Sequence, residues 1–150
     1  MNMGNKTKIG YRYLDIDLVQ FATFDENYDA QCEDIQIDNE IRFNYQHTDH
    51  LVISEISVTY LQHEKPVMKA LMKSVFSLSV DSIKSLVVDN VLILNIPILI
   101  QFASLNYGAL RGALSQKTLG MSLHNYILPP IYFDNIIKSP FKIKIDPIGK

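Results

Sequence analysis

The chain is poor in cysteine and glycine, and each shortage excludes a class of site. Cys32 is the single cysteine among 150 residues, so we predict no intrachain disulfide and no cysteine-built metal centre. Only 6 glycines are present, and no run of them resembles the glycine-rich loop that cradles phosphates in nucleotide-binding proteins. We therefore expect no cofactor.

The chain also lacks a strong excess of either positive or negative charge. The 14 Lys and Arg residues against 16 Asp and Glu residues give a formal net charge of −2. This balance argues against nucleic acid or an anionic membrane surface as the main partner. The chain is thus predicted to bind neither nucleic acid nor membrane.

Long unbroken hydrophobic runs are missing as well. The most apolar stretch, residues 86–103, is interrupted by Asp89, Asn95 and Pro97, among others. A membrane-spanning helix prefers about 20 consecutive apolar residues. The first ten residues, MNMGNKTKIG, contain no apolar segment of a secretory signal. We expect no membrane span and a cytoplasmic location.

Side chains that commonly carry catalysis are scattered. His47 and His50 fall in one predicted turn and His63 in the next, at opposite ends of a shared strand, so these imidazoles do not converge on a metal ion. The acidic stretch of residues 25–38 lacks the spacing and central glycine of a calcium loop, and no serine has a nucleophile-elbow context. We expect no metal site, no catalytic residue and no enzymatic activity.

The first two-thirds of the chain is typical of an antiparallel sheet. Alternating apolar residues predict strands at residues 10–21, 40–46, 52–62 and 67–80, with an acidic loop over residues 25–39. The alternation changes phase at Tyr13 and Leu14, which predicts a bulge. Short turns between the last three strands favour a meander.

The rest of the chain is mainly helical. Residues 81–94 are ambiguous between helix and strand, with Asp81 or Ser82 as a possible cap. Asn95 and Pro97 mark the start of a long helix that ends near Gly120. Its apolar stripe comprises Ile98, Phe102, Leu105, Ala109 and Ala113, with Leu99 and Leu110 beside it. A proline loop, a short helix over residues 133–138 and a brief strand or loose tail over residues 141–150 follow. This order predicts one α+β domain over residues 1–150.

Three apolar features leave two interpretations open. Met68, Met72 and Phe76 share one face of a strand and suit either core packing or an adaptable binding surface. Gly108-x-x-x-Gly112 permits close approach of another backbone, from the same chain or from another copy. Residues 128–133, around Pro129 and Pro130, form an extended segment that either covers the core or walls a groove.

The sequence NIPILIQFASLNYGALRGALSQKTLG followed by LPPIYFDNII resembles the C-terminal half of the SecB export chaperone family. There a helix of the type N-I-L-F-P-Y-A-R leads through a glycine-containing loop to L-x-P-V-N-F. The matching positions are residues 95–103, then Leu128, Pro130, Ile131 and Phe133. The stretch VFSL, residues 75–78, also resembles the family's I-F-S-I at the end of its fourth strand. The order of predicted elements agrees along most of the chain.

The resemblance implies a four-stranded antiparallel sheet followed by a long helix, a proline loop and a short helix. It also implies an ATP-independent holdase, working as a homotetramer built as a dimer of dimers, that binds unfolded or nascent polypeptides. The implied groove comprises Met68, Met72, Phe76, Leu128, Ile131, Tyr132 and Phe133. The implied contact between copies comprises Ile98, Phe102, Leu105, Gly108 and Gly112.

Departures from the family bear on the partner. Lys69 and Lys73 stand in the strand where the family uses an acidic position to dock the SecA motor, and Ser104 replaces an arginine. These changes argue against SecA, although the resemblance keeps it among the candidate partners. SecB-like proteins outside export, some paired with toxin–antitoxin modules, are a better comparison. The alternatives are a subunit dedicated to one protein partner, such as an antitoxin-type client, and a small-molecule-binding or enzymatic domain.

Overall fold

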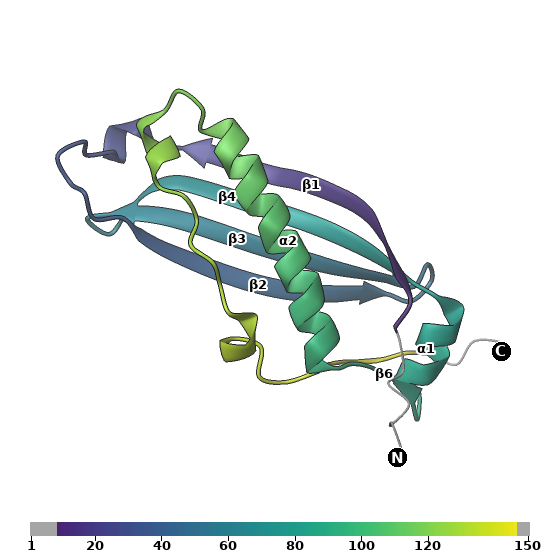
Figure 1. Ribbon diagram of the computed structural model, residues 1–150. Helices are drawn as coiled ribbons and strands as arrows, with labels where there is room; N and C mark the ends of the chain where they lie inside the picture. Colours follow the sequence, from purple (N-terminus) through teal and green to yellow (C-terminus); the bar gives the residue numbers. More distant parts are fainter. Residues whose placement is uncertain (1–8, 147–150) are drawn as a thin grey trace, which may run out of the picture.

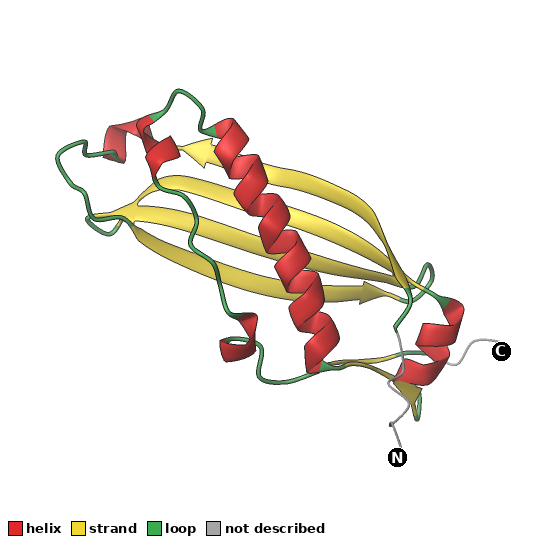
Figure 2. Ribbon diagram, viewed as in Figure 1, coloured by secondary structure: helices red, strands yellow, loops and turns green. Residues whose placement is uncertain are grey.

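The computed structural model describes residues 9–146 and contains two antiparallel sheets, the larger of which has the strand order β1-β4-β3-β2. Its strands are β1 (Tyr11–Thr23), β2 (Gln36–Gln46), β3 (Leu51–Gln62) and β4 (Lys65–Leu78). The long helix α2 (Ile96–Lys117) crosses one face of this sheet (Figure 1). Figure 2 shows no described helix over the opposite face. The predicted four-stranded α+β fold is therefore confirmed.

Alternation along the strands decides which face is buried. On β3, Val52, Ile56 and Tyr60 point toward α2 and are buried, and Met72 lies beside Ile56 on β4. The predicted loop over residues 25–39 ends too late, because β2 already begins at Gln36. Ile37 pairs with Tyr60 on the helix side, and the acidic residue between Ile37 and the predicted strand, Asp38, is exposed to solvent.

The edge strand β1 is irregular in two places. Its pairing with β4 shifts register between Tyr13 and Asp15, which confirms the bulge predicted from the change of phase. A second shift between Leu18 and Gln20 was not predicted. The bulged residues Leu14 and Val19 are about half exposed, so the breaks turn apolar side chains toward solvent.

The ambiguous residues 81–94 contain both structures. Ser79, rather than Asp81 or Ser82, caps the helix α1 (Val80–Leu86) by accepting a hydrogen bond from the Ser82 N–H. The short strands β5 (Val87–Val88) and β6 (Val91–Leu94) then form a hairpin. Its two turn residues both have positive φ, which the tight primed turn requires.

Helix α2 begins where predicted and ends slightly earlier. The Asn95 side chain accepts a hydrogen bond from the Ile98 N–H at 3.1 Å, and Gly120, with φ of 81°, lies in the turn after the helix. The buried face comprises Ile98, Leu99, Phe102, Ala103, Asn106, Tyr107, Leu110 and Leu114. The predicted stripe is wrong at Leu105, which is exposed, and it missed the buried Asn106 and Tyr107. Ala109 and Ala113 are half-buried and pack against the core, as predicted.

A polar cluster lies between α2 and the middle of the sheet. The Asn106 amide nitrogen donates to the Ser54 carbonyl at 2.9 Å and to the Ser54 hydroxyl at 3.2 Å. Its amide oxygen accepts from the Ser74 hydroxyl at 2.6 Å, and the Tyr13 hydroxyl contacts Ser74 in turn. Asn106, Ser54 and Ser74 are fully buried. The cluster therefore ties one helix position to three strands.

After α2 the chain returns along the same face of the sheet. The turn η2 (Ser122–Asn125) leads to an extended segment, and the predicted helix at residues 133–138 is only the 3-10 turn η3 (Phe133–Asn135). The strand β7 (Phe141–Lys144) then pairs with β6 in the smaller sheet, of order β5-β6-β7. Of the two alternatives for residues 141–150, a brief strand or a loose tail, the strand is the one that forms at Phe141–Lys144. Residues 1–8, where no signal was expected, and residues 147–150 lie outside the described residues.

Candidate functional site

The returning segment, residues 126–136, is here called the strap. It runs beside α2 on the same face of the sheet (Figure 1), and it has no strand pairing over its length. Pro129 and Pro130 have no N–H to donate, and each restricts the residue before it to extended conformations. The strap therefore needs other groups to hold it against the body.

Three side chains from the body bind consecutive parts of the strap backbone. The Tyr60 hydroxyl donates to the Tyr126 carbonyl at 2.9 Å, and the Arg111 Nε–H donates to the Leu128 carbonyl at 3.0 Å. The Tyr107 hydroxyl donates to the Pro129 carbonyl. Such bonds contribute about 1 kcal/mol each. The strap is thus anchored by side chains of β3 and α2 in place of a strand ladder.

The two anchoring phenols remain donors at neutral pH. Burial, with a smaller contribution from Tyr107, raises the pKa of Tyr60 to about 12. Burial also raises the pKa of Tyr107, although the Arg111 charge opposes this. Both hydroxyls stay protonated across the physiological range, so pH changes there leave these anchors in place.

Side chains of the strap divide between the core and solvent. Leu128 and Phe133 are buried, and the Phe133 ring packs edge-on against the Tyr107 ring with centroids 5.8 Å apart. Ile127 and Tyr132 are 74% and 71% exposed, and Ile136 is half exposed. Both interpretations of the proline segment therefore apply to different residues: alternate side chains cover the core, while the others present a rigid apolar surface.

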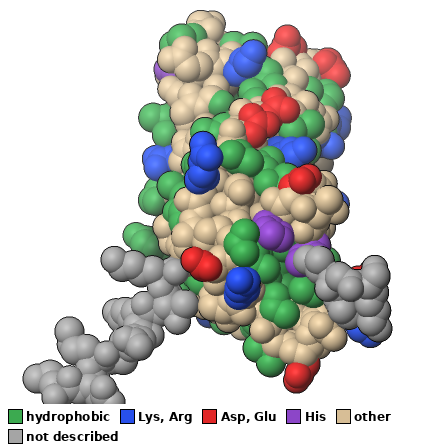
Figure 3. All heavy atoms as spheres, turned by 90° about the vertical axis from the view of Figure 1, so that its right-hand side faces the viewer, with side chains coloured by type: hydrophobic (Ala, Val, Ile, Leu, Met, Phe, Trp, Pro, Cys, Tyr) green, Lys and Arg blue, Asp and Glu red, His purple; other side chains and the backbone are tan. Residues whose placement is uncertain are grey.

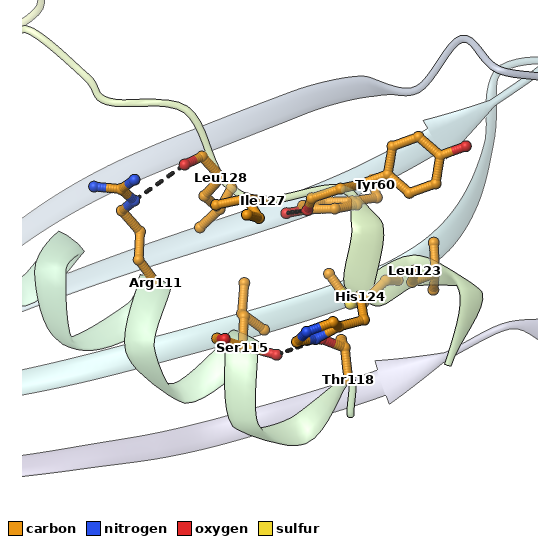
Figure 4. Close-up of a pocket in the computed structure, with 11 residues that line it drawn as sticks. Tyr60, Arg111, Ser115, Thr118, Leu123, His124, Ile127 and Leu128 are labelled. Carbon is orange, nitrogen blue, oxygen red and sulfur yellow. Dashed lines mark hydrogen bonds between the residues drawn. The ribbon is translucent and has the colours of Figure 1, made fainter. Parts of the chain in front are cut away.

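A pocket opens between the strap and the C-terminal half of α2 (Figure 4). Its interior is small, about 20 Å³, which is room for about one water molecule. The lining residues are Tyr60, Met68, Arg111, Leu114, Ser115, Thr118, Leu123, His124, Tyr126, Ile127 and Leu128. The floor is apolar, whereas Arg111, Ser115 and His124 give one side polar groups. The exposed Ile127 adjoins this mixed pocket.

The structure corrects the groove prediction for three residues. Met68, Met72 and Phe76 are at most 2% exposed and lie in the core beneath α2. In this arrangement they offer no surface to a partner, because the helix covers their face of the sheet. Of the other predicted groove residues, Tyr132 is exposed, Ile131 is half-buried, and Leu128 and Phe133 are buried.

The residues predicted to form the contact between copies are partly buried in the core and partly exposed on α2. Ile98 and Phe102 are buried in the core and are not available to another copy. Leu105, Gly108 and Gly112 lie on the outer side of α2 and are exposed. A Cβ added at either glycine meets no atom within 4 Å, so the glycines serve no close contact inside the described chain. The interpretation that they pack α2 on its own sheet is therefore wrong.

The outer face of the sheet carries charges of both signs. In the pairing register, Arg42 of β2 lies beside Glu55 of β3, Glu55 beside Lys73 of β4, and Lys73 beside Asp17 of β1. The row thus alternates positive and negative from one edge to the other. This row is therefore not uniformly acidic, as a docking site for a basic partner would be.

The two histidine-containing turns lie at opposite ends of β3, as the sequence predicts. His47 and His50 have ring centroids 5.5 Å apart, and Figure 3 shows histidines together on this end of the molecule. His63, at the other end of β3, contacts Asp29 at 3.0 Å and lowers the pKa of that carboxyl. Within residues 9–146, no group of three or more metal-ligating side chains is close enough to hold an ion. No helix in that range has the length and hydrophobicity to cross a membrane.

The residues that anchor the strap were not found from the sequence. Tyr60 looks like an ordinary core tyrosine of an alternating strand, and Tyr107 and Arg111 lie outside the apolar stripe that was counted on the helix. Their spacing of four residues does place both on one side of α2. That signal becomes informative only when the position of the strap is known, since nothing local indicates which carbonyls they bind.

Comparison with known proteins gives a match at the level of structure alone. No family model matches the sequence, and no curated protein matches it. The SecB-like chaperone Rv1957 of Mycobacterium tuberculosis, solved in complex with a ChAD peptide from the Rv1956 HigA1 antitoxin, superposes with a TM-score of 0.53 at 13% identity. The match covers 81% of this chain and 90% of that one. The chain therefore has a SecB-like fold, as the resemblance predicted.

Proposed function

We propose that the protein is an ATP-independent chaperone that holds unfolded or nascent polypeptide against the strap. The observation that carries this proposal is the exposure of Ile127 and Tyr132, at 74% and 71%, on a backbone fixed by Tyr60, Tyr107 and Arg111. Large apolar side chains in a rigid setting lose little conformational entropy when they bind. The protein is in this view a binding protein without catalysis.

Binding by the strap is tested with the double variant Ile127→Ser, Tyr132→Ser. We expect about tenfold weaker binding of an unfolded client, because desolvation of these two side chains supplies much of the apolar contact. The measurement is the concentration of protein that halves light scattering by a chemically unfolded client after dilution.

Val88→Ser is the matched control, since Val88 is also an exposed apolar residue, at 56%, but lies on β5, away from the strap. It should suppress aggregation as the parent protein does. Both variants should keep the free energy of unfolding within about 0.5 kcal/mol, because the substituted side chains are at the surface. A parent protein without any effect on scattering contradicts the chaperone proposal.

We further propose that copies of the chain associate through the outer side of α2 into a homo-oligomer, with a tetramer built as a dimer of dimers implied by the resemblance. Gly108 and Gly112 support this, because mid-helix glycine costs about 1 kcal/mol relative to alanine and neither glycine has a close contact in the described chain. Leu105 is exposed beside them. A second helix packed closely on this side accounts for all three residues.

The double variant Gly108→Ala, Gly112→Ala separates this proposal from a solvated helix face. If α2 packs on another copy, the added methyl groups hold the backbones apart. The oligomer is then weaker and dissociates at a higher protein concentration than the parent oligomer does. Sedimentation velocity over a concentration series measures this. If the face is solvated, assembly stays unchanged and the free energy of unfolding rises by about 1–2 kcal/mol.

A dedicated protein partner is the second candidate function. The structural neighbour Rv1957 binds a peptide from an antitoxin, and the outer sheet face of this chain alternates in charge. Both observations favour a partner of the antitoxin type over the SecA motor and over a role in export. A cytoplasmic location belongs to the same proposal. Capture of one stoichiometric protein, with no effect on unrelated unfolded clients, is the result that distinguishes this function from a general holdase.

A further inference from the structure

The polar side of the strap pocket contains an unneutralised charge. Arg111 uses Nε to bind the Leu128 carbonyl at 3.0 Å. Its terminal Nη groups have no hydrogen-bond or ion-pair partner among residues 9–146. Figure 4 shows the guanidinium beside the strap, with a dashed line to Leu128. The side chain is therefore held at one end of its guanidinium and free at the other.

A second donor lies one helical turn further along α2. Ser115 follows Arg111 by four residues, so both lie on the same side of the helix and line the same pocket. The Ser115 hydroxyl has no hydrogen bond to another described residue. Arg111 and Ser115 thus present free hydrogen-bond donors along one edge of the pocket mouth.

The hydrogen-bond arrangement at His124 fixes which of its nitrogens carries a proton. The Thr118 hydroxyl donates its hydrogen to the Leu114 carbonyl at 2.7 Å. It must therefore accept from His124 Nδ1, which lies 3.1 Å from the same oxygen. In the neutral ring Nε2 then has no hydrogen and is an acceptor. His124 lines the end of the pocket with its Nδ1–H already used by Thr118.

The residues that line the pocket carry no acidic charge. None of them is an Asp or Glu, and Arg111 is the one Lys or Arg among them. A carboxylate at the mouth therefore meets no acidic lining residue and is attracted to Arg111.

We propose that this edge recognises an acidic side chain in an extended client segment. An aliphatic side chain of the client covers the apolar mouth beside Ile127, and an adjacent Asp or Glu pairs with the Nη groups of Arg111 and the hydroxyl of Ser115. A guanidinium suits a carboxylate because its parallel N–H groups match the two oxygens. The hydrogen bond to Leu128 fixes the guanidinium before binding. This inference rests on the proposed polypeptide binding by the strap.

The test uses the full chain and fluorescein-labelled, end-blocked peptides of apolar and Gln residues, in which a single Gln is replaced by Glu at each position in turn. The parent protein is expected to bind the best Glu peptide about fivefold more tightly than the all-Gln peptide. The gain should be confined to one or two positions and shrink as salt is raised. An equal gain at all positions, or none, overturns the proposal.

Arg111→Met is expected to abolish the preference for Glu while the all-Gln peptide keeps most of its affinity. Arg111→Lys should keep part of the preference, and Ser115→Ala should reduce it. Because Arg111 also holds the strap, the decisive quantity is the Glu-to-Gln affinity ratio, which a merely structural role does not change. A ratio that survives in Arg111→Met overturns the inference.

Two further outcomes separate the inference from the proposal on which it rests. If the parent protein binds Gln and Glu peptides equally, polypeptide binding stands and recognition of the carboxylate is wrong. If it binds neither, polypeptide binding itself fails. Peptides with a free C-terminal carboxylate and no Glu complete the set, and tighter binding of these than of every internal Glu peptide contradicts the assignment to an acidic side chain.

Discussion

Replacing Phe102 with alanine is expected to lower the free energy of unfolding by about 3–5 kcal/mol. Phe102 is 0% exposed, and its ring stacks on Phe76 with centroids 4.0 Å apart and planes 13° apart. Tyr11 packs edge-on against the same ring at 4.9 Å. Alanine leaves a cavity between α2 and the sheet that these rigid rings cannot fill. Urea unfolding followed by circular dichroism measures the loss.

Leu105→Ala is the matched control for this prediction. Leu105 is three residues along the same helix but is 39% exposed, so its truncation should cost under about 1 kcal/mol. Comparing the two variants also distinguishes core residues of α2 from residues that contact another copy. If Phe102→Ala kept its stability and only dissociated an oligomer, the ring would belong to a contact between copies, and its burial within one chain would be contradicted.

Replacing Asn106 with alanine is expected to cost about 2–4 kcal/mol. The amide is 0% exposed and satisfies the Ser54 and Ser74 hydroxyls and the Ser54 carbonyl. Without it these groups are left in a dry interior, where an unmade hydrogen bond costs about 1–3 kcal/mol. Equilibrium unfolding in urea gives the value, with Ser104→Ala on the exposed side of α2 as the control expected within about 0.5 kcal/mol.

A double-mutant cycle shows whether the cluster acts as a unit. Removing Ser74 after Asn106 should cost less than removing Ser74 alone, because its partner has already gone. Strictly additive effects of Asn106→Ala and Ser74→Ala would contradict the network. An Asn106→Leu protein of normal stability would instead indicate that the amide selects the register of α2 on the sheet and adds little net stability.

Local signals were sufficient for most of the fold. The strands follow from alternation, the start of α2 from Asn95 and Pro97, and the first bulge from the change of phase at Tyr13. The end of the acidic loop was misjudged, since Asp38 is polar because it faces solvent and not because it lies in a loop. The helix stripe was misjudged because a buried asparagine counts as polar in any pattern, although Asn106 is satisfied by strands that come much earlier in the chain.

The site was less accessible to prediction for a physical reason. Met68 and Phe76 lie on a strand in which apolar and polar residues alternate, a pattern that does not show whether the apolar face is covered. Only the position of α2 decides that it is. For the strap, Pro129 and Pro130 correctly indicated an extended segment. Tyr132, which was predicted to line a groove, is exposed. Which side chains face inward depends on three long-range hydrogen bonds, and no local pattern contains that information.

The two register breaks in β1 limit how the molecule can polymerise. An open strand edge is a template on which further chains stack, and apolar side chains such as Leu14 and Val19 would encourage fibre growth there. A regular incoming strand loses its match with β1 at Tyr13 and again at Leu18, so it cannot form a continuous ladder along this edge. The irregular backbone of β1 thus protects a protein with exposed apolar side chains against amyloid-like growth.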